Sequence, residues 1–122
     1  MRYPGLTLRI LGAGNPAMGP GKAELIARIA ATGSISAAAR DMGMSYRRAW
    51  QLVEALNTSF SEPVVVTAIG GKRGGGASVT SFGRELVANF HAMENKASAA
   101  IVDELAQFTR QIRKPATRRK RA

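Results

Sequence analysis

Apolar residues recur with helical spacing in three short segments of the chain and then along one long segment. Leu25, Ile26 and Ile29 follow one another at the intervals of a helix face, and Gly33 comes shortly after them. These intervals place side chains on one side of a helix with 3.6 residues per turn, and glycine is the commonest residue just beyond a helix end. The pattern therefore predicts a first helix that ends at Gly33.

A second and a third helix follow, separated by one glycine. Ser34 and Ser36 are candidate N-caps of a short helix, and Gly43 then supplies a turn because glycine reaches positive φ without steric cost. Ser45 is the expected cap of a helix over residues 46–57. The predicted buried stripe of that helix comprises Ala49, Leu52, Val53 and Leu56. Two helices joined by a glycine turn are the layout of a helix-turn-helix.

Shorter runs predict strands at two places. Residues 6–11 alternate apolar and polar side chains, which indicates a half-buried strand, and residues 12–21 are a Gly/Pro-rich loop. After the third helix, residues 63–68 and 77–79 are typical of strands. The segment 69–76 between them is basic and too rich in glycine for a strand interior. A basic hairpin loop at this position is typical of a wing.

Thr80 is the expected cap of a long amphipathic helix over residues 80–113. Its apolar residues recur at intervals of three and four and comprise Phe82, Leu86, Phe90, Met93, Ala97, Ile101, Leu105, Phe108 and Ile112. At about 1.5 Å per residue this helix would be about 45–50 Å long, which exceeds the diameter of the rest of a small domain. We therefore expect a second copy of the chain to cover the stripe in a homodimer.

The predicted fold class is mostly α with a small β-wing. A winged helix-turn-helix with a long C-terminal dimerisation helix is expected over residues 1–113, and a basic disordered tail over residues 114–122. Eighteen Lys and Arg against eight Asp and Glu give a net charge of +10, which predicts a nucleic-acid partner. With no cysteine, no run of roughly 18 apolar residues and no signal peptide, the chain is expected to be cytoplasmic and nucleoid-associated.

The outward side of the third helix carries the candidate base contacts. Arg47 and Arg48 have the donor pair that binds guanine O6 and N7, and Gln51 can bond adenine in the same bidentate way. Ser45 and Tyr46 stand at the helix start, where hydroxyls and backbone amides suit phosphate oxygens. The alternative for this arc is a solvated helix face, and for Ser45 a plain N-cap.

The remaining candidate DNA contacts lie in the wing and at the second helix. Lys72 and Arg73 are flanked by glycines, including Gly74, that let the loop approach a phosphate backbone or a minor groove. Ser34 and Ser36 complete the set of candidate DNA contacts.

Other conspicuous residues point away from catalysis. Trp50 is expected to pack in the core or against the wing, on a face shared with Tyr46, and direct contact with a base is the alternative. His91 has no cysteine or acidic partner at ligand spacing and is interpreted as an interface or surface residue. The glycine loop lacks the Gly-Lys-Ser/Thr of a P-loop, and the carboxylates are scattered. We therefore expect no enzymatic activity, no cofactor and no metal site.

Four segments carry a resemblance to a known family: residues 34–39, 44–50, 70–77 and 80–83. Together they resemble the N-terminal DNA-binding domain of the molybdate-responsive ModE regulators and, more distantly, the winged helix-turn-helix of LysR-type regulators. The resemblance implies a dimeric transcription regulator. It places Ser45, Tyr46, Arg47, Arg48 and Gln51 along the major groove, the wing on the flanking backbone and the Thr80 helix at the dimer interface. Full-length members continue into oxyanion-binding domains, whereas this chain ends at Ala122, so no response to molybdate is expected.

The expected function is therefore a sequence-specific DNA-binding transcriptional regulator acting as a homodimer. A nucleoid-type architectural binder with low sequence specificity is the alternative, and an evenly spread footprint on DNA would favour it. A protein-interaction module whose basic patch meets an acidic partner is a third interpretation, although a basic glycine-rich hairpin has little use there.

Overall fold

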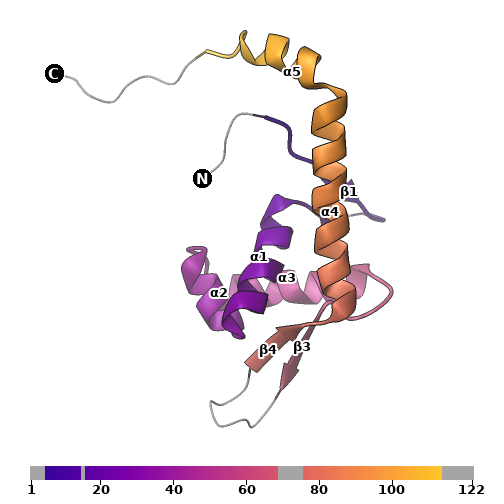
Figure 1. Ribbon diagram of the computed structural model, residues 1–122. Helices are drawn as coiled ribbons and strands as arrows, with labels where there is room; N and C mark the ends of the chain where they lie inside the picture. Colours follow the sequence, from indigo (N-terminus) through magenta and orange to yellow (C-terminus); the bar gives the residue numbers. More distant parts are fainter. Residues whose placement is uncertain (1–4, 15, 69–75, 114–122) are drawn as a thin grey trace, which may run out of the picture.

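The computed structural model of the chain describes residues 5–14, 16–68 and 76–113. Within these ranges the chain forms a mostly helical domain with two small antiparallel sheets, which confirms the predicted winged helix-turn-helix class (Figure 1). The helices are α1 (Pro20–Thr32), α2 (Ile35–Asp41), α3 (Tyr46–Ser59), α4 (Ser81–Ala100) and α5 (Val102–Thr109). The strands are β1 (Ile10–Leu11), β2 (Pro16–Met18), β3 (Val65–Ala68) and β4 (Gly76–Val79).

The link between α1 and α2 is fixed by a glycine and a serine. Gly33 has φ 71° and ψ 18°, and its N–H donates to the Ile29 carbonyl. The Ser34 hydroxyl oxygen then accepts the Ala37 N–H at 3.0 Å. Ser36 lies inside α2 with its Oγ 3.1 Å from the Ser34 Oγ. The predicted cap at Ser34 is thus confirmed, whereas the one at Ser36 is wrong because the helix has already begun.

The turn between α2 and α3 follows the predicted chemistry. Gly43 has φ 69°, in the left-handed region that other residues adopt at a steric cost. The Ser45 hydroxyl oxygen accepts the Arg48 N–H at 3.0 Å, so α3 begins at the next residue. Caps and the glycine turn act within a few residues, which is why the sequence alone located both ends of this turn.

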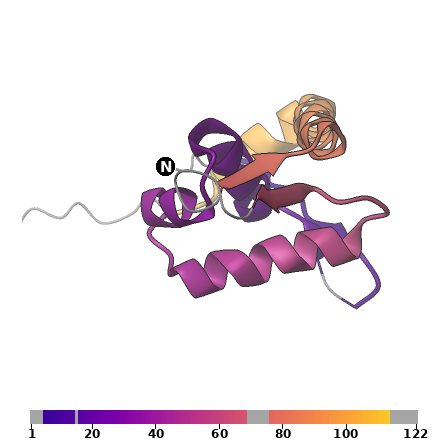
Figure 2. The same ribbon diagram turned by 90° about the horizontal axis from the view of Figure 1, so that it is seen from below.

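The hydrophobic core lies where α1, α2 and α3 meet the strands of the wing. Its largest fully buried side chains are Phe90, Leu25, Ile26, Ile29, Leu56, Val53 and Val64. In the predicted stripe of α3, Ala49, Val53 and Leu56 are buried and Leu52 is half-buried. Figure 2 shows α3 along one side of the domain and α4, seen end-on, on the other, with β3 and β4 between them. The outer side of α3 therefore stays exposed.

The wing strands β3 and β4 are attached to both α3 and the end of α1. The Asn57 side chain on α3 donates to the Val65 carbonyl at 2.9 Å and accepts the N–H groups of Val64 and Val65 at 2.8 and 3.1 Å. The N–H of Ala77 on β4 donates to the Gly33 carbonyl at 3.0 Å. The two predicted strands are confirmed with slightly shifted starts, and the predicted wing loop, 69–75, lies outside the described residues.

The N-terminal segment differs from its prediction. Within the alternating run 6–11 only Ile10 and Leu11 form a strand, and they pair with β2 inside the segment expected to be a loop. Leu8 and Ile10 nevertheless pack against the core. The alternation thus reports burial of one side of the segment, whereas strand pairing also needs a partner, and β2 is short because α1 begins at Pro20.

The long C-terminal helix is interrupted. Thr80 caps α4 as predicted, with its hydroxyl oxygen accepting the Gly83 N–H at 2.9 Å. The helix ends at Ala100 because Ile101 has φ −118° and ψ 24°, and α5 then bends away from the end of α4 (Figure 1). The prediction of one continuous helix over residues 80–113 is therefore wrong. Apolar spacing reports which face is apolar, and it does not test whether the backbone stays helical between turns.

Candidate nucleic-acid interface

The helix-turn-helix presents α3 with its outer side in solvent. α2 packs across α3, and the Met44 N–H, in the turn, donates to the Ala39 carbonyl at 3.0 Å. The buried Ala39 and Ala49 have small side chains that suit close packing of the two helices. The turn and the packing fix the direction of α3 relative to the rest of the domain, as a helix that enters a DNA groove requires.

Arg47 and Gln51 lie on the exposed side of α3. Both side chains are exposed, and they lie four residues apart, one turn along the same side of α3. The exposed residues Ser45, Tyr46 and Arg48 stand beside them at the start of the helix. The structure thus brings together all the candidate contacts of the third helix. Arginine and glutamine spaced by one turn can donate and accept on neighbouring base edges in a major groove.

Tyr46 and Trp50 share one flank of α3. Their rings meet edge to face with centroids 6.2 Å apart and planes at 83°, and Tyr46 is 54% exposed. Trp50 is half-buried and packs against the core. The predicted shared face and the packing role of Trp50 are confirmed. The exposed phenol leaves a hydroxyl for a polar partner at the helix start.

The structure describes only some of the remaining candidate DNA contacts. Ser34 is half-buried and uses its side-chain oxygen as a cap, whereas Ser36 is exposed at the first turn of α2. Lys72, Arg73 and Gly74 of the predicted wing loop lie outside the described residues.

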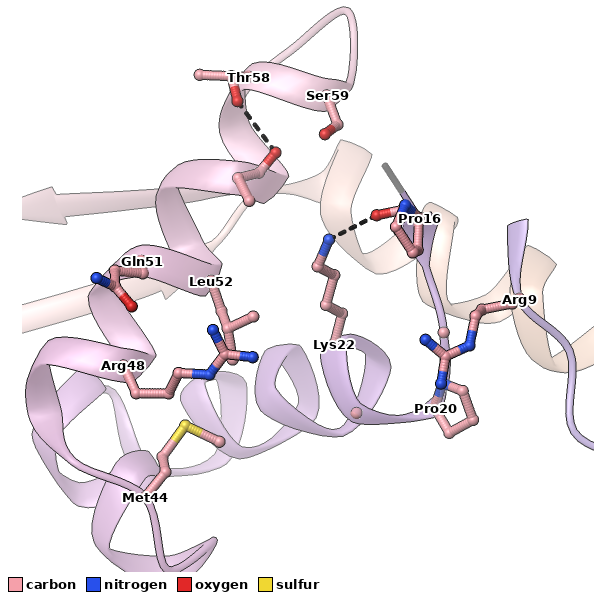
Figure 3. A pocket seen from close by; sticks show the side chains of 13 residues that line it. Arg9, Pro16, Pro20, Lys22, Met44, Arg48, Gln51, Leu52, Thr58 and Ser59 are labelled. Carbon is pink, nitrogen blue, oxygen red and sulfur yellow. Dashed lines mark hydrogen bonds between the residues drawn. The ribbon is translucent and has the colours of Figure 1, made fainter. Parts of the chain in front are cut away.

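The sequence prediction missed two cations, Arg9 and Lys22, that face α3. Together with Arg48 they border a hollow of about 550 Å³ between the start of α1, the N-terminal hairpin and α3. Figure 3 shows Arg48 and Arg9 reaching in from opposite sides with Lys22 between them. Lys22 donates from Nζ to the Pro16 carbonyl at 2.8 Å. Nothing in the local pattern marks Arg9 or Lys22, because the hollow forms only when β1, β2 and α1 fold against α3.

The charges around this hollow repel one another. Burial lowers the pKa of Lys22 below its ordinary value, and the nearby positive charge of Arg48 lowers it further. No carboxylate is among the described residues that border the hollow. Among all the residues that the structure describes, no acidic side chain lies within 4.0 Å of any of the three cations. The hollow is thus a place where an anion would be stabilised.

His91 has an acidic neighbour that the sequence interpretation missed. Its Nδ1 lies 3.0 Å from Glu94 Oε1, one helical turn away on α4, and the His91 side chain is 57% exposed. The statement that His91 lacks an acidic partner is therefore wrong, because residues three apart on a helix are neighbours. Within residues 5–14, 16–68 and 76–113 no group of three or more His, Cys, Asp or Glu could hold a metal ion.

The predicted dimer stripe divides into a buried and an exposed half. Phe90 is only 1% exposed within its own chain, and Phe82 and Leu86 pack partly against the same core. These three residues support the protomer, so their apolar character needs no partner subunit. Beyond them, Met93 and Phe108 are 44% and 68% exposed. Ala97, Ile101 and Leu105 are half-exposed, and Val102 and Ile112 are exposed.

None of the described helices is both long and apolar enough to cross a membrane.

Comparison with known proteins gives a consistent set of relatives. The model of the bacterial regulatory helix-turn-helix proteins of the LysR family matches residues 21–84. The molybdenum-pterin-binding protein MopB of Rhodobacter capsulatus is 44% identical over 95 residues, which are 78% of this chain and 34% of the relative. The molybdenum transport protein ModE of Azotobacter vinelandii is 35% identical over 89 residues, 73% of this chain and 33% of the relative. The DNA-binding transcriptional dual regulator ModE of Escherichia coli K12 is 41% identical over 68 residues, 56% and 26% of the two chains. The chain thus spans about a third or less of the length of these relatives.

Proposed function

We propose that this chain reads a specific DNA sequence with α3 and acts as a homodimer. The chain belongs to the LysR family of bacterial regulatory helix-turn-helix proteins, and on that ground it is a DNA-binding regulator of transcription. The family match and the relatives confirm the resemblance to ModE and LysR-type regulators seen in the sequence. The family is one of regulators, not of enzymes.

The observation that carries the proposal is the outward pair Arg47 and Gln51 at the start of a helix held by a capped glycine turn. Recognition helices read bases with residues near their N-termini, while neighbouring groups hold the phosphates. In this proposal Arg47 and Gln51 read base edges, and Ser36, Ser45 and Tyr46 bind the backbone. Ser34 supports the helix start near the DNA.

The wing loop is included in the proposed DNA interface because of its sequence. Lys72, Arg73 and Gly74 lie in the basic loop between β3 and β4, and a loop at that position contacts the backbone or the minor groove beside the recognition helix. The partner is double-stranded DNA, so the protein acts in the cytoplasm.

Replacing Arg47 with alanine is expected to relax sequence preference rather than abolish binding. After in vitro selection of a binding site, the Arg47→Ala variant should bind that site about 5- to 150-fold more weakly, which corresponds to about 1–3 kcal/mol. Its affinity for scrambled DNA should change much less. Repeating the selection with this variant should lose the preference at one base pair.

The matched control is Arg84→Ala. Arg84 is exposed at the start of α4, so the Arg84→Ala substitution removes the same charge far from α3. Equal loss on the selected and scrambled sites in Arg47→Ala would contradict base reading. A selection that returned no motif would favour the architectural alternative.

The exposed half of the apolar stripe supports the homodimer. Met93, Phe108 and their neighbours on α4 and α5 leave large apolar side chains in water, and burying each one against a second copy would stabilise the assembly. In an isologous dimer the two recognition helices would lie about one helical turn of DNA apart and read paired half-sites.

Light scattering at micromolar concentration should give twice the 12.9 kDa mass of the chain. The variant Phe108→Glu is expected to shift the mass toward the monomer, because it would place a charge in the apolar interface. The control Gln107→Glu adds the same charge at the neighbouring exposed position. A folded monomer for the wild type, or dimers in both variants, would contradict this interface.

A further inference from the structure

The hollow beside α3 gathers positive charge from three segments that are distant in the sequence. Arg9 precedes β1, Lys22 lies in the first turns of α1, and Arg48 is on α3, yet all three side chains border one space (Figure 3). The recognition helix as proposed above does not require Arg9 or Lys22. The convergence of these three cations therefore indicates that the hollow binds a separate ligand.

We propose that this hollow is a subsite for one DNA backbone phosphate, on the flank of α3 opposite the wing. The inference rests on the proposed function, because it assumes that α3 enters a DNA groove. It adds two phosphate-binding residues, Arg9 and Lys22, and gives Arg48 a role on the backbone rather than at a base edge.

The two flanks of α3 support this placement. Arg48, Leu52, Ala55 and Ser59 follow one another at intervals of four, three and four, and all four border the hollow. The opposite flank carries Asn57, which is hydrogen-bonded to Val64 and Val65 at the start of the wing strand β3. The helix thus lies between the wing and the hollow.

A helix in the major groove has a phosphate backbone on each side of it. The groove is about 12 Å wide and admits one helix, so each flank of that helix approaches one strand. The wing would contact the backbone on one side, and the hollow with its three cations would receive the backbone on the other. Two such contacts fix the tilt and the register of α3, which backbone contacts do in general.

The local chemistry favours an anion with several oxygens. Lys22 uses one donor on the Pro16 carbonyl and retains two others, and each arginine presents several N–H groups. Burial and, to a smaller extent, repulsion by Arg48 lower the Lys22 pKa, and an anion between the two side chains would favour the charged form of Lys22. The hollow, at about 550 Å³, is far larger than the roughly 30 Å³ of a water molecule, so it has room for a phosphodiester with part of its sugars.

The test combines a lysine variant with DNA that carries one neutral phosphate. The selected site is prepared as a series in which a single methylphosphonate replaces each phosphate in turn. Lys22→Gln is expected to bind unmodified DNA about three- to tenfold more weakly and to lower the slope of log affinity against log salt by about one phosphate. At one position of the series, neutralisation should weaken the wild type strongly and weaken Lys22→Gln clearly less, because only Arg9 and Arg48 still attract that phosphate in the variant. Arg48→Gln should show a reduced effect at the same position.

The matched control is Lys96→Gln, which removes a lysine charge from an exposed position on α4. It should behave as the wild type at every position of the series. If Lys22→Gln and Lys96→Gln weaken binding equally, or if neutralisation weakens Lys22→Gln as much as the wild type at every position, the subsite is refuted while sequence-specific binding stands. A wild type that selects no motif refutes the proposed function instead.

A second arm identifies the source of the phosphate. Inorganic phosphate is titrated into the DNA-free protein and followed by amide NMR at Gly21, Lys22 and Arg48. Weak shifts without saturation up to tens of millimolar are expected, because the open hollow relies on the DNA to hold the phosphate in place. Saturable binding at micromolar phosphate, together with equal effects of neutralisation on Lys22→Gln and the wild type at every position, would assign the hollow to a free anion and overturn the proposal.

Discussion

Replacing Gly83 with alanine is expected to destabilise the domain by about 2–3 kcal/mol, although alanine is the better helix former. A Cβ at this position would lie 2.6 Å from the Val64 carbonyl oxygen and 2.9 Å from the Val79 Cγ1. The carbonyl cannot move freely, because it also accepts the Thr80 N–H at 3.0 Å. The first turn of α4 would therefore have to separate from the wing strands.

Thermal unfolding measured by circular dichroism should show a fall in Tm of roughly 8–15 °C. Protein concentration must be kept equal, since dimerisation would make Tm depend on it. The matched control is Gly21→Ala in α1, where an added Cβ would meet nothing within 4 Å. An equal Tm for Gly83→Ala and the wild type would show that α4 can shift without cost.

Replacing Asn57 with alanine is expected to lower the free energy of unfolding by about 2–4 kcal/mol. The substitution removes three hydrogen bonds between α3 and the start of β3, and it leaves the N–H groups of Val64 and Val65 without that acceptor. Both valines are buried, so water cannot easily replace the lost acceptor. Urea unfolding at matched concentrations gives the free energy of unfolding directly.

Two further variants separate the hydrogen bonds from other effects of the substitution. Asn89→Ala changes an exposed asparagine on α4 and should alter the free energy of unfolding by less than about 0.5 kcal/mol. Asn57→Asp keeps the accepting oxygen but places the other carboxylate oxygen near the Val65 carbonyl, where Asn57 had donated at 2.9 Å. An intermediate loss is expected. If Asn57→Ala were as stable as Asn89→Ala, the bonds from Asn57 would not hold the wing to α3.

The candidate site was predictable where its signals are local. Ser45, Gly43 and the apolar stripe of α3 act over one or two turns, so the exposed position of Arg47 and Gln51 follows from them. Arg9 and Lys22 had no such signal. One lies in an alternating run and the other at a helix start, and each pattern is explained by local structure alone.

The C-terminal stripe shows the same division. The intervals from Phe82 to Phe108 correctly identify an apolar face, yet Phe90 is buried in its own chain while Phe108 is exposed. Periodicity assigns residues to a face and does not say which neighbour covers it. The periodicity also gives no sign of the break at Ile101, where the backbone leaves the helical region.

By itself, the sequence determined the helix-turn-helix, its caps and glycine turns, the wing strands and the positive charge. These properties depend on backbone preferences and side-chain periods within a few residues. Only the tertiary structure decided where α4 ends, which part of its stripe is buried and how the N-terminal hairpin pairs. It also brought Arg9, Lys22 and Arg48 around one hollow. The physical reason is that these features depend on contacts between segments far apart in the chain, whose packing no local pattern encodes.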